Sequence, residues 1–484
     1  MNKELKRVST VVLLMFLALF VSTSVIQVAS VDSLKADPRN SRTLYDSFSA
    51  ERGPILVDGV AIAESTPVDD AFSYLRTYSN GPLYAPVTGY FTLNQGNTGV
   101  EGSLNDYLSG SANEQFLNKL YGIITGQDPK GAAVETTIDA SVQQAAWDAL
   151  GSNSGAVVAI VPQTGEILAM VSKESFDPNL LAVHKTSEVI ASYEALSADA
   201  GKPLVNRAIG GDLYPPGSVF KIIMTAAALE SGEYTPESEF PNPPRLTLPE
   251  SSNVIRNAGG SNCGGGENAS IATALRLSCN IPFAQLGLAL GNERVRDMAE
   301  GFGFGTSFDL PMASTPSQYP QTASDAEQML SSFGQASDRV TPLQMAMVSA
   351  AVANGGTVMQ PTVVEKILGP DLTVLQQFEP TVFNNPISPE NADIIKQMMV
   401  DGVANGAASN ARISGVDVGG KTGTAENGGS RPYTLWFTGF APADNPQVAV
   451  AVVVENGGGL GQSAFGNQIA APIAKKVIEA VLSR

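Results

Sequence analysis

The chain has 484 residues, which is longer than one hydrophobic core ordinarily supports, so we expect two or three domains. A content of 43% hydrophobic and 16% charged residues is that of a folded protein and argues against long disordered segments. The net charge of −18 argues against a nucleic-acid-binding surface, which needs a basic footprint, although an acidic protein can still hold a local basic pocket.

The first thirty residues have the pattern of a membrane segment. Lys3, Lys6 and Arg7 precede an uncharged run over residues 8–30, which is long enough to span a hydrocarbon core as a helix. Basic flanks stay in the cytoplasm, so residues 1–7 are expected to be a cytoplasmic tail and the bulk of the chain to lie outside. The alternative is a cleaved signal peptide ending near residues 28–30, but the length of the run favours a retained single-pass anchor.

Residues 31–130 are expected to form a small N-terminal module. Apolar residues alternate on both sides of Asp58-Gly59, which predicts a hairpin there. Apolar residues at helical spacing over residues 104–123 predict a helix. The glycine-containing link over residues 126–131 is the expected boundary, which leaves residues 131–484 as a second domain large enough for a full core.

The second domain begins with a predicted helix over residues 141–150, capped by Asp139 or Ser141. Two apolar segments, residues 155–161 and 167–171, flank a Thr164-Gly165 turn and predict a strand hairpin. Three more strands are predicted over residues 416–420, 435–440 and 448–455, followed by an amphipathic helix over 471–482. This order predicts an α/β domain in which helices cover an antiparallel sheet.

The chain has two cysteines, Cys263 and Cys279, whose spacing excludes a CxxC metal or redox site. Outside the cytoplasm they could form a disulfide that closes a loop of about 15 residues, worth roughly 3 kcal/mol in the chain-entropy model. Two free, buried thiols are the alternative, and the expected export of the domain favours the disulfide.

The stretch Pro215-Pro216-Gly217-Ser218-Val219-Phe220-Lys221 places a serine and a lysine at the start of an apolar helix. The one histidine, His184, has no surroundings that suggest a site, so a Ser-His-Asp triad is not expected. Ser218 would lie at the helix N-terminus, where backbone N–H groups can stabilise an oxyanion, and Lys221 would lie one turn on along the same face. The helix end and a second cation would favour a neutral, basic Lys221.

Ser-x-x-Lys alone is a weak signal, because many helix N-termini match it. Further along the chain come Ser278-Cys279-Asn280, after an apolar helix-like run, and Lys421-Thr422-Gly423, at the end of a predicted strand. Each triplet is also common: Ser278 could cap a turn, Asn280 could bond to backbone, and Lys421 could be a surface lysine. All three motifs in this order form the set found in penicillin-binding proteins and class A β-lactamases.

On these motifs the chain resembles a class B penicillin-binding protein, a monofunctional, membrane-anchored peptidoglycan D,D-transpeptidase of bacterial cell-wall synthesis. Other stretches that resemble the family are residues 52–58, 137–143, 164–170, 333–335, 340–346 and 436–442. There are two departures: Cys279 lies in the middle of the second motif, where β-lactamases prefer Asp, and Ala336 follows Gly334-Gln335 where glycine is frequent. Neither removes a functional group from the site.

The resemblance implies a penicillin-binding, serine β-lactamase-like transpeptidase domain over residues 131–484. It also implies a pedestal or dimerisation-like module over residues 31–130 and an anchor in the bacterial cell membrane. No metal or other cofactor is expected, because the sequence shows no cluster of His, Cys and carboxylate residues. The expected partners are peptidoglycan stem peptides, β-lactams, and a separate glycan polymerase with division or elongation proteins.

The resemblance also implies a role for each motif residue. Ser218 would be the nucleophile and Lys221 its base, and the N–H groups of Ser218 and Thr424 would form the oxyanion hole. Ser278 would relay a proton to the leaving nitrogen, and Asn280 would bind the substrate amide or hold Lys221. The substrate-binding residues implied are Lys421, Thr422, Gly423 and Thr424, with Lys421 and the two threonine hydroxyls recognising the terminal carboxylate.

Two alternatives to a transpeptidase remain at this point. One is a hydrolase with the same site, a carboxypeptidase or β-lactamase, although the Glu-x-x-x-Asn segment of class A β-lactamases is not found between Asn280 and Lys421. The other is a β-lactam sensor or a division scaffold that has lost activity, although the motif side chains are all present. The sequence leaves open septal or side-wall action, stem-peptide preference and oligomeric state.

Overall fold

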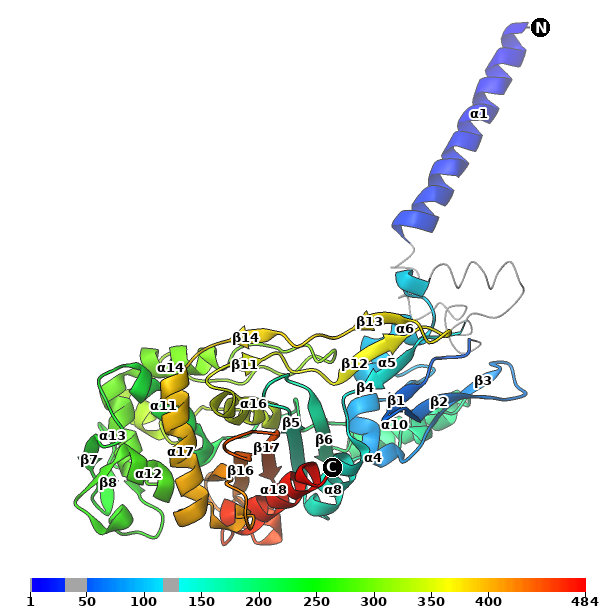
Figure 1. Cartoon of the computed structure of the whole chain (residues 1–484). Helices are drawn as coiled ribbons and strands as arrows, with labels where there is room; N and C mark the ends of the chain where they lie inside the picture. The colour runs from blue at the N-terminus through cyan, green and yellow to red at the C-terminus, as the bar shows by residue number, and fades with distance from the viewer. Residues whose placement is uncertain (1, 31–49, 116–129) are drawn as a thin grey trace.

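The computed structural model describes residues 2–30, 50–115 and 130–484, whose arrangement is shown in Figure 1. Helix α1, Asn2–Ser24, continues into a short π-helical segment, Val25–Ala29. Within those ranges this is the one helix long and apolar enough to cross a membrane, over residues 3–27. The predicted span over residues 8–30 therefore coincides with a helix of sufficient length.

A five-stranded antiparallel sheet lies at the centre of the larger part of the molecule. Its strand order is β15-β16-β17-β5-β6, with bounds Gly419–Ala425, Thr434–Ala441, Val448–Val454, Gly155–Ile160 and Ile167–Lys173. Every residue of β16, β17 and β5 is buried. Helices therefore cover both faces of this sheet, as the sequence predicted.

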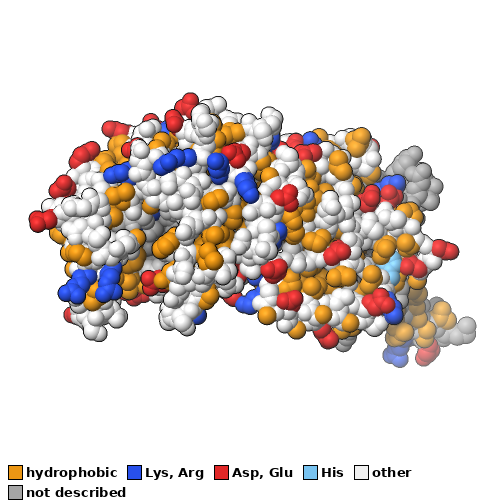
Figure 2. All heavy atoms as spheres, turned by 90° about the horizontal axis from the view of Figure 1, so that it is seen from below, with side chains coloured by type: hydrophobic (Ala, Val, Ile, Leu, Met, Phe, Trp, Pro, Cys, Tyr) orange, Lys and Arg blue, Asp and Glu red, His pale blue; other side chains and the backbone are white. Residues whose placement is uncertain are grey.

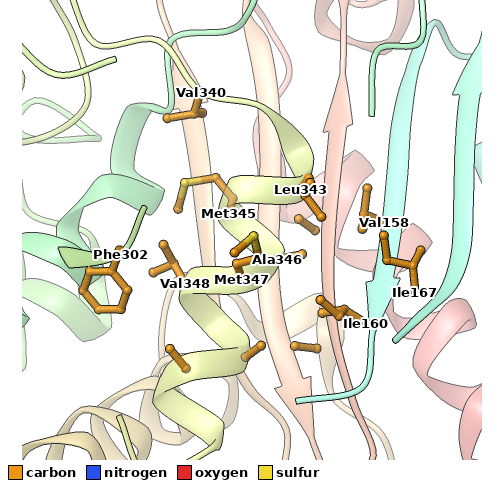
Figure 3. Close-up of a cluster of buried hydrophobic side chains, with 14 of the residues drawn as sticks. Val158, Ile160, Ile167, Phe302, Val340, Leu343, Met345, Ala346, Met347 and Val348 are labelled. Atoms are coloured by element: carbon orange, nitrogen blue, oxygen red, sulfur yellow. The ribbon is translucent and has the colours of Figure 1, made fainter. Parts of the chain in front are cut away.

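Alternate side chains of the sheet enter two different cores. On β17, Val450 and Val452 pack in one core with helices α8, Ala140–Leu150, and α18, Gly466–Leu482. Ala449 and Ala451 face the other core, which contains α11, Lys221–Glu230, and α16, Pro342–Ala353. In Figure 3 the side chains of α16 lie between Phe302 on one side and the strand residues on the other. Helix α16 is buried along its whole length, so it ties the sheet to the helical part of the molecule.

Between β6 and β15 the chain forms a helical region that also contains three two-stranded sheets of short strands. Its other helices are α9, Asn179–Ala182; α10, Thr186–Ala198; α12, Ile271–Leu277; α13, Ile281–Leu290; α14, Asn292–Gly301; α15, Asp325–Ser331; and α17, Pro389–Asn405. Its short strands are β7, Glu239–Pro241; β8, Arg245–Thr247; β9, Val254–Arg256; β10, Asn268–Ser270; β11, Val358–Met359; and β14, Val382–Asn384. Strand β7 pairs with β10, β8 with β9, and β11 with β14.

A second sheet combines strands from both sides of the predicted boundary near residue 130. Its order is β13-β12-β4-β1-β2-β3, with bounds Val374–Gln377, Val364–Leu368, Ala133–Thr136, Ile55–Val57, Val60–Pro67 and Tyr74–Tyr78. Helices α4, Gly81–Thr88, α5, Gly99–Ser103, and α6, Asn105–Leu108, belong to this part. The domain boundary near residue 130 stays a prediction. In space, the second sheet joins strands from before that boundary, β1–β3, to strands from after it, β4, β12 and β13.

A buried ionic cluster holds the N-terminal part together. Glu101, whose exposed fraction is 0%, accepts hydrogen bonds from Arg52 Nε and Arg76 Nε, both at 2.6 Å. Tyr78 donates its hydroxyl proton to the same carboxylate. The sequence analysis used residues 52–58 only as part of the family resemblance and did not predict that Arg52 would belong to a buried ion cluster.

Most predicted elements are confirmed. The hairpins around Asp58-Gly59 and Thr164-Gly165 are β1–β2 and β5–β6, and Asp139 caps α8 by accepting from the N–H groups of Ser141 and Val142. The predicted helix over residues 104–123 is confirmed only at its start, because α6 covers Asn105–Leu108 and Gly110 then takes a left-handed φ of 75°. The rest of that prediction lies outside the described residues.

One predicted strand is misplaced along the chain. Residues 416–420 were expected to be the strand and Lys421 its end, whereas β15 runs over Gly419–Ala425 and contains the third motif.

The surface seen from below in Figure 2 carries acidic and basic side chains interspersed with apolar and polar ones.

Candidate active site

Ser218 lies in a tight turn wedged between three segments. It belongs to a 3₁₀ turn, Gly217–Phe220, that leads directly into α11. Gly217 has a left-handed φ of 54°, and its N–H donates to the Gly334 carbonyl at 2.8 Å. A Cβ at Gly217 would lie 3.1 Å from backbone atoms of Thr424 on β15. A side chain at either glycine would therefore push the nucleophile's turn away from the sheet.

The turn is also fixed from the sheet and from the next segment. Trp436 on β16 donates its indole N–H to the Pro215 carbonyl at 3.0 Å. Tyr214 and Val340 exchange two backbone hydrogen bonds. These contacts explain why residues around 214–217, 333–335 and 436, far apart in sequence, share the family resemblance: they are neighbours in space.

Lys221 is the first residue of α11 and its exposed fraction is 0%. Its Nζ lies 3.0 Å from Ser218 Oγ, and it donates to the Ser278 carbonyl at 2.9 Å and to Asn280 Oδ1 at 2.8 Å. These three oxygens hold the amine in one position, within hydrogen-bond reach of the serine proton.

Burial is the main reason that Lys221 can act as a base. It lowers the pKa of Lys221 well below 10.5, and the charge of Lys421 lowers that pKa further. The sequence predicted the effect of the second cation. It did not predict the larger effect on this pKa, which is the desolvation of the amine, because the Ser-x-x-Lys motif does not show whether the lysine is buried.

Ser278 and Asn280 lie in the turn between α12 and α13. Ser278 has a left-handed φ of 65° at the C-terminus of α12, a conformation that costs a non-glycine residue of order 1–2 kcal/mol. The turn directs the Ser278 carbonyl at Lys221, while the Ser278 hydroxyl accepts from Lys421 Nζ at 2.7 Å. Of the two roles implied for Asn280, the geometry supports holding Lys221.

Lys421 lies within β15 with an exposed fraction of 3%. Besides Ser278, its Nζ donates to the Thr422 carbonyl at 2.8 Å. Burial lowers the pKa of Lys421 to about 7. An arriving carboxylate would favour the charged form of this lysine, so the free site is poised to gain a proton when an anion binds.

The two threonines of the third motif also bond to the protein itself. Thr422 donates its hydroxyl to the Ala407 carbonyl at 3.2 Å, and Thr424 Oγ1 accepts from the N–H of Gly466 at 3.1 Å. Gly423 packs against Pro216 and Trp436, where a Cβ would lie 2.9 Å from each. The binding of a carboxylate by these residues stays a prediction.

Cys263 and Cys279 are joined by a disulfide, so the middle residue of the second motif is covalently tied to the segment before β10. His184 lies elsewhere, 2.5 Å from Asp70 through its Nδ1, and takes no part in this site. Among residues 2–30, 50–115 and 130–484 we found no group of three or more His, Cys, Asp or Glu side chains that could hold a metal ion.

Comparison with known proteins identifies the family. The penicillin-binding protein transpeptidase domain matches residues 155–479, which is more than half of the chain. The chain belongs to this family of penicillin-binding proteins. The penicillin-binding protein A dimerisation domain matches residues 52–134.

Several relatives of this penicillin-binding protein are similar over most or all of its length. The peptidoglycan D,D-transpeptidase PbpA of Mycolicibacterium smegmatis is 42% identical over 100% of this chain and 99% of its own. The ceftriaxone acyl-enzyme structure of penicillin-binding protein A from M. tuberculosis has 39% identity and a TM-score of 0.87, covering 90% of this chain and 100% of its own. Penicillin-binding protein 2 of Pseudomonas aeruginosa has 29% identity and a TM-score of 0.73, covering 90% and 96%.

Proposed function

We propose that this chain is a peptidoglycan D,D-transpeptidase that works through an acyl-enzyme on Ser218 and is acylated there by β-lactams. The observation that carries the proposal is the fully buried Lys221 amine 3.0 Å from Ser218 Oγ, within a family whose relatives are named for this activity. A neutral amine at that distance accepts the serine proton as the nucleophile attacks.

In the proposed reaction Ser218 Oγ attacks the carbonyl carbon between the two terminal D-alanines of a stem peptide. The new C–O bond forms, the C–N bond breaks, and Lys221 takes the serine proton, while the leaving D-alanine nitrogen receives its one proton from the Ser278 hydroxyl, which Lys421 resupplies. The N–H groups of Ser218 and Thr424 stabilise the oxyanion, and losing one such donor typically costs about 3–4 kcal/mol of barrier lowering. An amine from a second strand then attacks the ester: the new C–N bond forms, the C–O bond to Ser218 breaks, Ser218 recovers its proton from Lys221, and the proton released by the amine returns to Lys421 through Ser278.

We assign the recognition of the substrate to the remaining motif residues. Lys421, with the hydroxyls of Thr422 and Thr424, binds the terminal carboxylate, and Ser278 passes a proton to the leaving nitrogen. Helix α1 anchors the enzyme in the bacterial membrane with residues 1–7 in the cytoplasm and the catalytic domain outside. A separate glycan polymerase and division or elongation proteins are the expected partners.

Labelling with a fluorescent penicillin tests this function. We expect the purified full-length chain to form a long-lived covalent adduct at Ser218, which peptide mapping would locate. Ser218→Ala should abolish the adduct without lowering the unfolding temperature. Ser261→Ala, a change at an exposed serine of the same helical region, should label like the wild type.

The outcomes separate the competing functions. Rapid turnover to free penicilloate with little bound label would make the chain a hydrolase. Labelling that survives Ser218→Ala would refute the assignment of the nucleophile. Growth that is fully supported by the Ser218→Ala variant would favour a scaffold.

A further inference from the structure

The turn that carries Ser278 and Asn280 is held from behind by a buried asparagine of another segment. Asn257 follows strand β9 and has an exposed fraction of 3%. Its Oδ1 accepts from the backbone N–H of Asn280 at 2.9 Å and from that of Ile281 at 3.0 Å. These are the first N–H groups of α13, which have no partner inside their own helix.

Asn280, at the N-cap position of α13, makes no side-chain capping bond of its own. Its side chain is used elsewhere: Oδ1 accepts from Lys221, and Nδ2 donates to the Arg256 carbonyl at 2.9 Å. Asn257 thus caps α13 from outside the helix and leaves the Asn280 side chain available to the catalytic lysine. Residues 256 and 257 together fix both the backbone and the side chain of Asn280.

Asn257 is itself fixed by a second buried asparagine. Its Nδ2 donates to Asn242 Oδ1 at 2.8 Å, and Asn242, with an exposed fraction of 0%, donates from Nδ2 to the carbonyls of Cys263 and Gly266. The disulfide from Cys263 to Cys279 joins the same two segments covalently. The second motif is therefore attached to the segment over residues 242–266 by hydrogen bonds of two asparagine side chains and by one covalent bond.

This attachment explains how the turn keeps its geometry. A left-handed φ at a non-glycine residue such as Ser278 persists only where the surrounding structure over-determines it. In this turn the Ser278 carbonyl and Asn280 Oδ1 are two of the three oxygens that hold Lys221 Nζ. A shift of the turn by about 1 Å would misplace the base, which can cost of order 100-fold in rate.

We propose that Asn257 is a positioning residue for the acylation of Ser218: its amide holds the Ser278–Asn280 turn, and through that turn the Lys221 amine. It does not touch the substrate. The inference rests on the proposed transpeptidase function. An amide suits this place better than a carboxylate, because a negative charge behind the turn would stabilise the protonated form of Lys221, whose pKa is otherwise set by burial and by Lys421.

Two substitutions at Asn257 test the proposal in the full-length protein, with the acylation rate by a labelled penicillin measured across pH. Asn257→Ala should slow the acylation step by about 10- to 100-fold, with reversible binding of the β-lactam nearly unchanged. Asn257→Asp keeps an acceptor for both N–H groups and should shift the acid limb of the rate profile to higher pH, because it raises the pKa of Lys221. Asn268→Ala and Asn268→Asp, at an exposed asparagine of β10, are the matched controls.

The proposal is overturned if both Asn257 variants acylate at the wild-type rate with the wild-type pH profile. It is also overturned if Asn257→Ala loses activity only in proportion to its unfolded fraction, measured by circular dichroism. If the alanine variant does not fold, the nearly isosteric aspartate variant decides through its pH profile. A wild-type protein that is not acylated at all would instead refute the proposed function.

Discussion

Lys421→Arg is the substitution that most directly tests the electrostatics of the site. Lys421 has its pKa lowered to about 7 by burial, whereas an arginine stays charged at every pH the protein survives. The carboxylate of a substrate or β-lactam needs the charged form of this residue. The neutral form of Lys221 is needed at the same time, so the two lysines set opposite limbs of the pH profile.

The expected size of the effect follows from the pKa. In the free wild-type enzyme at about pH 8, one unit above that pKa, roughly one Lys421 in eleven is charged, so the second-order acylation rate should be about tenfold below its maximum. At about pH 9 the loss should be roughly 100-fold. In Lys421→Arg the alkaline limb should disappear up to about pH 9, while the acid limb, which reports Lys221, remains.

The measurement is the second-order rate of acylation by a labelled penicillin from about pH 6 to pH 9, below the saturating concentration, so that it reports the free enzyme. Lys366→Arg, the same change at a partly exposed lysine of β12, is the control and should leave the profile unaltered. An alkaline limb near pH 7 that persists in Lys421→Arg would refute the assignment of that limb to Lys421.

Two further predictions concern the stability of the scaffold. Ala336 has a left-handed φ of 61°, so Ala336→Gly should remove a backbone strain of about 1–2 kcal/mol. The greater entropy of the unfolded glycine chain should offset about 0.5–1 kcal/mol of this gain. Thermal denaturation should therefore show a slightly more stable protein, and a destabilised variant would contradict this. Glu101→Ala leaves Arg52 and Arg76 buried without their carboxylate and should destabilise the N-terminal part by about 3–5 kcal/mol, with the exposed Glu64→Ala as control; equal unfolding temperatures for the two variants would show that the cluster contributes little.

Elements with a strong local pattern could be predicted from the sequence. The uninterrupted apolar run of β17 and the capped helix α8 are examples, because burial of both faces of a strand or of one face of a helix leaves a recognisable pattern in the sequence. Strand β15 was displaced because its residues, Gly419–Ala425, combine glycines, threonines and a lysine, which resemble a loop rather than a buried strand. Its burial comes from neighbours that are remote in the chain.

Long-range pairing was the main feature that could not be predicted. Strand β4 pairs with β12, so that Val134 lies opposite Ile367, and no local signal joins these segments. The same limit applies to the site. The three motifs identified the side chains that meet in the site. The burial of Lys221 and the hydrogen bonds from the Ser278–Asn280 turn to Asn257 depend on segments that carry no motif. In the sequence alone, Asn257 resembles any asparagine of a turn.

The second motif connects the two lysines through different atoms of one serine. The Ser278 carbonyl accepts from Lys221, and its hydroxyl oxygen accepts from Lys421. The resemblance implied that Ser278 would relay a proton to the leaving nitrogen, and of the two lysines it is Lys421 that contacts the hydroxyl.

This contact determines where the Ser278 proton can go. Because the hydroxyl oxygen accepts from Lys421, its own hydrogen must point to a third partner, and during acylation the leaving nitrogen is the group that needs a proton. A charged Lys421 therefore serves the reaction twice, by binding the substrate carboxylate and by making the Ser278 hydroxyl a better donor. The loss of its charge should for this reason lower the rate of the acylation step itself as well as the affinity for the substrate.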